Sequence, residues 1–170
     1  AKKEVEKLIS SDLSQNTTHK IRWLSYAQIT KSVPVIWAQV KKDNKNFEKR
    51  DLIILASLAR LDEKEAGVKL CNYYKSTINR TNYEYVFTAK QIAFSFDETV
   101  LQCLVDDYKT MDINWNYRDG DTGFTPSQVV GGAITEMIKN YPYKKGEYNI
   151  DPKQLLYWLN QNNQYELNEK

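Results

Sequence analysis

The chain has 170 residues, a formal net charge of +2, 41% hydrophobic residues and 27% charged residues. This composition excludes an intrinsically disordered protein, which needs low hydrophobicity and high net charge, and the length predicts one domain over residues 1–170 that requires no metal or disulfide. No segment reaches the roughly 18 apolar residues of a membrane-spanning helix, and the first residues lack the apolar stretch of a signal peptide.

Apolar residues recur at helical spacing through the N-terminal half of the chain,. Pro34 suits the first turn of a helix, because a proline there gives up no intrahelical hydrogen bond. Asp62, followed three residues later by Glu65, predicts an N-terminal cap for another helix,. The helices predicted for this half cover residues 1–13, 17–29, 34–40, 47–61 and 62–78.

The C-terminal half begins with Tyr83–Phe87, whose aromatic and β-branched residues are typical of a strand or a short extended segment,. A cap at Thr88 predicts a helix after it, with a restart at Asp97. Thr125-Pro126 and Asp151-Pro152 each place a capping residue before a proline, which predicts two further helix starts,. The polar end of the chain, from Gln161 onward, is expected to fray.

These elements predict an all-α fold, a single compact, irregular bundle of about six or seven helices, with one short extended segment near residues 83–87 as the exception. Trp23, Trp37 and Trp158 fall within apolar stripes and are predicted to lie in the core,. The pair Gly131-Gly132 lies inside a predicted helix, where glycine is unfavourable, so it indicates a bend or the close approach of another helix.

Cys71 and Cys103 fit no metal-ligand spacing,. Both lie in apolar helical patterns, so we predict buried free thiols, with a disulfide as the alternative. Free thiols and the absence of a signal peptide together predict a cytoplasmic, reducing location, which would be the interior of the host cell for a viral protein. The abundance of Lys, Asn, Ile and Tyr is typical of an AT-rich genome, such as that of a low-GC bacterium, a phage or another virus.

The sequence contains no recognisable catalytic constellation. The only histidine, His19, lies at a predicted helix start, and a histidine-based triad needs a positioned histidine,. Asp119 and Asp121 lie in a glycine-containing loop, but the residues that follow do not match a calcium-binding loop. No glycine-rich phosphate-binding motif is present. We therefore predict no catalytic residue, no metal site, no cofactor and no enzymatic activity, with an active site built from distant carboxylates as a third alternative.

Basic residues are concentrated in the N-terminal half. Residues 1–85 hold 16 Lys and Arg against 10 Asp and Glu, whereas residues 86–170 hold 8 against 12. Lysines between helices can contact phosphates without reading sequence, so the densest basic stretch is a candidate nucleic-acid contact or, alternatively, a solvated loop. The opposite charges of the halves also predict a head-to-tail contact between copies of the chain. The candidate nucleic-acid-binding residues are Lys41, Lys42, Lys45, Lys49 and Arg50.

Aromatic residues gather in the predicted loops of the C-terminal half, and aromatic residues are enriched at protein interfaces. The alternative is that they cover the ends of the helical core. We favour a non-catalytic protein-binding or self-assembly module; the alternative is a nucleic-acid-binding accessory or coat-type protein that uses the lysine-rich segment. The candidate protein-interface residues are Trp115, Tyr117, Tyr141, Tyr143 and Tyr148.

Overall fold

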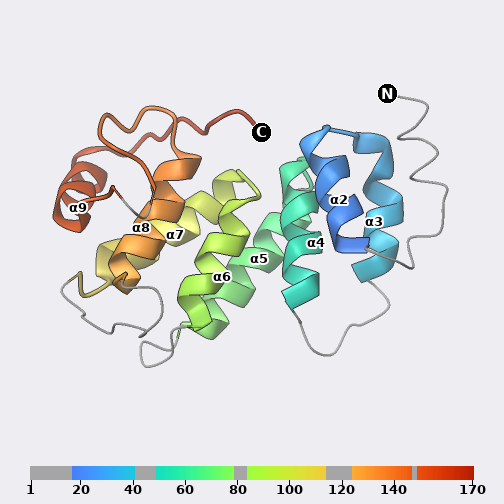
Figure 1. Cartoon of the computed structure of the whole chain (residues 1–170), viewed down its shortest axis with the longest axis horizontal. Helices are drawn as coiled ribbons and strands as arrows, with labels where there is room; N and C mark the ends of the chain where they lie inside the picture. The colour runs from blue at the N-terminus through green and yellow to red at the C-terminus, as the bar shows by residue number, and fades with distance from the viewer. Residues whose placement is uncertain (1–16, 41–48, 79–83, 114–123, 147–148) are drawn as a thin grey trace.

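The computed structural model describes residues 17–40, 49–78, 84–113, 124–146 and 149–170, so the helix predicted over residues 1–13 lies outside the described residues. The described residues form eight α-helices and one 3-10 turn, which confirms the all-α prediction (Figure 1). These elements are α2 (Thr17–Tyr26), η1 (Thr30–Ser32), α3 (Val33–Val40), α4 (Lys49–Arg60), α5 (Lys64–Thr77), α6 (Glu84–Ala93), α7 (Glu98–Thr110), α8 (Pro126–Met137) and α9 (Pro152–Gln161).

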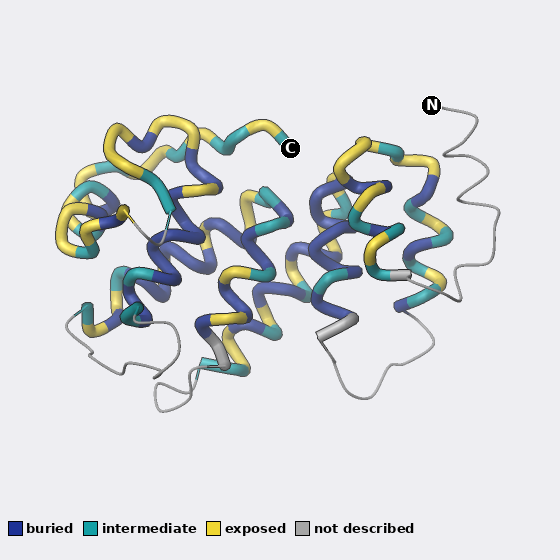
Figure 2. Tube along the Cα trace, viewed as in Figure 1, coloured by how far each residue is buried: buried dark blue, intermediate teal, exposed yellow. Residues whose placement is uncertain are grey.

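The helices form one layered bundle in which α2 and α3 lie at one end and α9 lies at the other (Figure 1). Helix α4 packs against α2, α3, α5 and α6, and α6 in turn packs against α8. One cluster of buried apolar side chains includes residues from all eight described helices, and buried residues run through the middle of the molecule (Figure 2). Residues 54–61 are all buried, as expected for the predicted central helix. None of the described helices is both long enough and apolar enough to cross a bilayer.

Three helix starts form where the capping residues predict them. Thr125 accepts a hydrogen bond from the backbone N–H of Gln128, whose side chain accepts one from the backbone N–H of Thr125 at 2.9 Å. Asp151 accepts hydrogen bonds from two N–H groups in the first turn of α9. Asp97 accepts one from Val100 N at 3.1 Å and starts α7. Each cap satisfies backbone donors that the first turn of a helix leaves unpaired.

The extended segment predicted near residues 83–87 is wrong where the structure describes it, because residues 84–87 form the first turn of α6. Thr88 does not cap a helix but lies buried inside this one. Val86, Ala89 and Ala93 are all buried and share one helical face,. Burial of this face outweighs the weak preference of aromatic and β-branched residues for strands.

Asp62 does not cap α5, which begins after Glu63 without a side-chain cap. Asp62 instead has a positive φ of 69° and ends α4. The N–H of Glu63 reaches Leu58 O at 3.1 Å and that of Asp62 reaches Ala59 O at 3.0 Å, the hydrogen bonds of a Schellman C-cap,. The end of one helix therefore overrides the capping pattern of the next.

Gly131 confirms the prediction of a close helix approach. A Cβ at this position would lie 2.7 Å from Ile150 Cδ1, and 3.0 Å from both Leu155 Cδ2 and Tyr108 Oη. The missing side chain thus lets α7 and the start of α9 pack directly against the backbone of α8.

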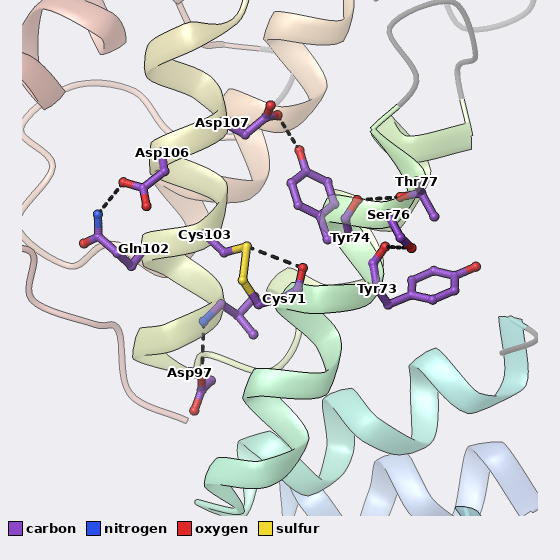
Figure 3. Close-up of a disulfide and its surroundings, with 11 residues drawn as sticks. Cys71, Tyr73, Tyr74, Ser76, Thr77, Asp97, Gln102, Cys103, Asp106 and Asp107 are labelled. Carbon is purple, nitrogen blue, oxygen red and sulfur yellow. Dashed lines mark hydrogen bonds between the residues drawn. A yellow bond between two sulfur atoms is a disulfide. The ribbon is translucent and has the colours of Figure 1, made fainter. Parts of the chain in front are cut away.

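The prediction of two free thiols is wrong, because Cys71 of α5 and Cys103 of α7 form a disulfide (Figure 3). Their Cα atoms are 5.9 Å apart, within the usual range for a disulfide, and both residues are buried,. On the same two helices, Tyr74 Oη donates a hydrogen bond to Asp107 Oδ2 at 2.7 Å. Helices α5 and α7 are therefore joined by a covalent bond and a buried polar contact.

The chain after α9 is ordered by contacts rather than frayed. Leu167 forms an antiparallel bridge with Ile138 at the end of α8. Asn168 N donates to Met137 O at 2.7 Å, and Lys170 forms an ion pair with Asp62 beyond the end of α4. This segment therefore supplies donors to carbonyls at the end of α8 and reaches across to α4, a tertiary role that its polar composition does not reveal.

Candidate functional site

The lysine-rich candidate site lies largely outside the described residues. Lys41, Lys42 and Lys45 fall in the undescribed segment before α4. Lys49 and Arg50 are the first two residues of α4, but their side chains are not described. The nucleic-acid contact at these residues stays a prediction.

Of the predicted interface aromatics, the structure describes only Tyr141 and Tyr143. Tyr141 is 4% exposed, and its ring centroid lies 5.2 Å from that of Trp158, edge to face. Its hydroxyl has no hydrogen-bond partner within the described residues, and burial raises its pKa to about 12. Tyr141 thus covers the core, the alternative that the sequence left open, while Tyr143 beside it is exposed. The other three lie outside the described residues: Trp115, Tyr117 and Tyr148.

Trp23 is not a core residue, contrary to the prediction, because its side chain is 76% exposed. Helix α2 buries Ile21 and Leu24, and Trp23 lies two residues after Ile21, which places it on the opposite side of the helix,. Trp37 and Trp158 are partly buried and pack against the core, in line with the prediction. An exposed tryptophan on a helix surface is a candidate contact residue.

A pocket of about 580 Å³ opens between α2 and α6, which we call the α2–α6 cleft. Tyr26 of α2 and Phe87 of α6 line it, and both side chains are exposed. Phe94 and Phe96, in the segment after α6, complete its aromatic lining. Two of these rings, Tyr26 and Phe87, therefore expose aromatic surface at the pocket.

Charged side chains from three helices also line the cleft. Arg22 comes from α2, Lys90 from α6 and Glu136 from α8. The Arg22 guanidinium carbon lies 4.8 Å from the centroid of the Phe94 ring, a cation–π distance,. Its Nε atom is buried without a hydrogen-bond partner, and among the described residues no carboxylate forms an ion pair with it. Within the described structure, Arg22 is therefore a cation whose position is set by an aromatic ring and whose charge is not neutralised by a neighbouring acid.

A second arginine, Arg60 at the end of α4, lies beneath the aromatic lining and is only 5% exposed. Its guanidinium carbon lies 4.8 Å from the centroid of the Tyr26 ring, 4.9 Å from that of Phe94 and 4.7 Å from that of Phe96. Its Nη1 donates a hydrogen bond to Phe94 O at 3.0 Å. Burial lowers the pKa of this guanidinium.

Arg60 lies where three helices end. Helices α2, α4 and α6 are followed by Gln28, Asp62 and Phe96 respectively, each with a positive φ although none is glycine. Helix C-termini carry negative partial charge, so their meeting stabilises a buried cation that has no carboxylate partner among the described residues,. This arrangement holds Tyr26, Phe94 and Phe96 around one guanidinium and so builds the floor of the cleft.

The local sequence pattern does not predict the cleft, because it places the start of α6 at Thr88 and an extended segment before it. Phe87, Lys90 and Gln91 share one face of α6, and Phe94 follows directly after its end, but the predicted helix begins only at Thr88,. When the helix begins at residue 84, its sequence has one apolar face and a second face that is aromatic and basic. The approach of this face to Arg22 and Tyr26 is a tertiary contact that no local pattern reveals.

Among the described residues, no group of three His, Cys, Asp or Glu side chains is arranged to hold a metal ion. Comparison with known protein families, with curated proteins and with solved structures finds no match to this chain. The cleft itself is therefore the starting point for a function.

Proposed function

We propose that this protein is a non-catalytic binding module whose α2–α6 cleft receives a segment of another protein. The observation that carries the proposal is the pair of exposed rings, Tyr26 and Phe87, that line one pocket. Trp23, 76% exposed, precedes Tyr26 by three residues on α2, so the two side chains are neighbours on the surface of that helix,. Tryptophan, tyrosine and arginine are the residues that most often dominate the energy of protein interfaces. The aromatic lining suits an apolar side chain of the partner, which enters the pocket.

Charge complementarity indicates the character of the partner segment. Two cations, Arg22 and Lys90, line the pocket, and Glu136 is the one acidic residue among the described residues that line it. The buried Arg60 adds a third positive charge in contact with the rings of Tyr26, Phe94 and Phe96. A segment with net negative charge is steered toward such a surface, whereas a basic segment is repelled. The proposed occupant is thus an acidic segment with an exposed apolar residue.

A selection from a random peptide library tests this function and defines the preferred segment in the same experiment. We expect enriched peptides that carry an apolar anchor and net negative charge. Trp23→Ala and Phe87→Ala should each weaken binding of such a peptide by at least about tenfold, the loss of a typical interface anchor. Tyr157→Ala is the matched control, because Tyr157 is an exposed aromatic, 69% accessible, on the distant helix α9. Failure to enrich any peptide, or equal binding by the Trp23 and Tyr157 variants, would overturn the proposal.

Parallel measurements test two other occupants of the cleft, a nucleic acid and a second copy of the chain. Single-stranded nucleic acid also stacks on exposed aromatics near positive charge. Anisotropy of a labelled oligonucleotide that rises with wild-type protein but not with Trp23→Ala would assign the cleft to nucleic acid and replace the protein partner. Sedimentation that shows self-association, abolished by the same variant, would assign the cleft to a second copy of the chain.

We also propose that the protein works in an oxidising compartment. The Cys71–Cys103 disulfide supports this, because cytosolic reductants keep thiols reduced whereas disulfides persist in extracellular and similar environments,. This proposal replaces the cytoplasmic, reducing location expected from the sequence. The protein is isolated from its natural source and denatured without reductant in the presence of a thiol-reactive maleimide. Its two cysteines should gain no label, because a disulfide has no free thiol. Labelling of both cysteines would overturn this location.

A further inference from the structure

We propose that Arg22 forms a carboxylate subsite in the α2–α6 cleft, which binds an acidic side chain next to the apolar anchor of the partner. This inference rests on the proposed function, because it assigns the chemistry of the segment that the cleft receives. The guanidinium of Arg22 has two properties that favour such a role: it lines the pocket, and it has no acidic partner in the described part of the chain. Its Nε is buried without a hydrogen-bond partner, as is that of Arg60, so the terminal N–H groups of Arg22 supply the contact to the carboxylate.

Stacking on Phe94 prepares Arg22 for this contact. The guanidinium lies 4.8 Å from the ring centroid, so the ring restricts the side chain before any ligand arrives. Restricting a flexible side chain in advance lowers the entropy cost of binding. An arginine so held can offer two parallel N–H donors to one carboxylate, which a lysine cannot do.

The two arginines at this ring have different roles. Arg60 is 5% exposed, donates to Phe94 O and lies where three helices end, so its hydrogen bonding serves the fold. Arg22 makes the same kind of ring contact but lines the open pocket, so its donors can reach a ligand. The charge of Arg60 nevertheless lies close to the same ring and adds to the positive potential that a carboxylate meets,.

Glu136 defines where the carboxylate binds. It lines the same pocket from α8, so an acidic group of the partner is repelled near Glu136 and attracted toward Arg22 and Lys90,. The apolar anchor then occupies the aromatic part of the pocket, between Tyr26 and Phe87. The arrangement selects an apolar residue with a carboxylate on one side only.

A matched pair of small probes tests the subsite directly. N-acetylphenylalanine carries a carboxylate beside an aromatic ring, and N-acetylphenylalanine amide carries a neutral carboxamide of nearly the same size in its place. We would follow the indole N–H signal of Trp23 in a nitrogen-15 NMR titration of the full chain with each probe. The acid should bind at least about tenfold more tightly than the amide to the wild-type protein, the effect of one charge-assisted contact.

Variants of Arg22 show whether this preference arises from the proposed residue. Arg22→Gln should remove the difference between acid and amide, and Arg22→Lys, which keeps the charge but not the two parallel donors, should retain only part of it. Equal binding of the two probes to the wild-type protein would overturn the carboxylate subsite and leave the apolar pocket intact. A preference for the acid that survives Arg22→Gln, or no binding of either probe, would also overturn it, while the peptide selection judges the proposed function separately.

Discussion

The α5–α7 interface and the α2–α6 cleft both join helices that are distant in sequence, but they use their polar groups differently. At the interface, Cys71 and Cys103 form a disulfide, and the hydroxyl of Tyr74 donates a hydrogen bond to Asp107 (Figure 3). In the cleft, Arg22 lines the pocket and forms no ion pair with any described residue. The polar groups at the interface are paired with one another, whereas the charged group in the cleft lines a pocket, which is why we propose a ligand there.

The cleft contains the same contrast within itself. Arg60 and Arg22 lie at nearly equal distances from the Phe94 ring, 4.9 and 4.8 Å, yet one is bonded into the fold and the other lines the pocket. Residue type and ring contact alone therefore do not distinguish the two arginines. The near-complete burial of Arg60 and the hydrogen bond from its Nη1 to Phe94 O do.

The largest effect on stability should follow from removing the disulfide. The cysteines are 32 residues apart in the chain, so Cys71→Ala combined with Cys103→Ala should lower the free energy of unfolding by about 3–4 kcal/mol, because the unfolded chain gains conformational freedom,. Urea denaturation of both proteins measures this difference. Reductant should destabilise the wild-type protein and leave the double variant unchanged. A wild-type protein that is insensitive to reductant would remove the covalent part of the contrast.

A smaller loss should follow from Arg60→Met, which keeps the length of the side chain but removes its charge and donors. Phe94 O loses its partner and three helix ends lose a nearby cation, so we expect about 2 kcal/mol of destabilisation,. Arg22→Gln is the control in the same cleft and should change stability by less than about 0.5 kcal/mol. Equal losses for the two variants would mean that both arginines serve the fold, and the distinction between them would be wrong.

The smallest of the three effects should come from Tyr74→Phe at the α5–α7 interface. The variant keeps the ring and removes one hydrogen bond of 2.7 Å to a carboxylate, which should cost about 1.5 kcal/mol,. The binding of N-acetylphenylalanine should stay unchanged, because this interface lies apart from the residues that line the cleft. Weaker probe binding in this variant would show that the two regions are coupled.

Much of the fold could be predicted from local patterns. Thr125, Asp151 and Asp97 cap helices because a side-chain oxygen and the N–H groups of the next turn are close together in the chain, whatever surrounds them,. Apolar spacing likewise predicted α2, α4 and α8, because one helical face must be buried. For these elements the sequence alone was sufficient.

The tertiary structure decided what each exposed or paired group does. Asp62 matched a cap, but it lies at the end of α4, whose backbone hydrogen bonds determine its conformation. Cys71 and Cys103 form a bond only because α5 packs on α7, and Trp23 is exposed because α2 turns Ile21 and Leu24 inward. The sequence by itself determined the all-α class and three of its helix starts, since these depend on neighbours in the chain. The disulfide and the cleft depend on neighbours in space, and no local spacing specifies them.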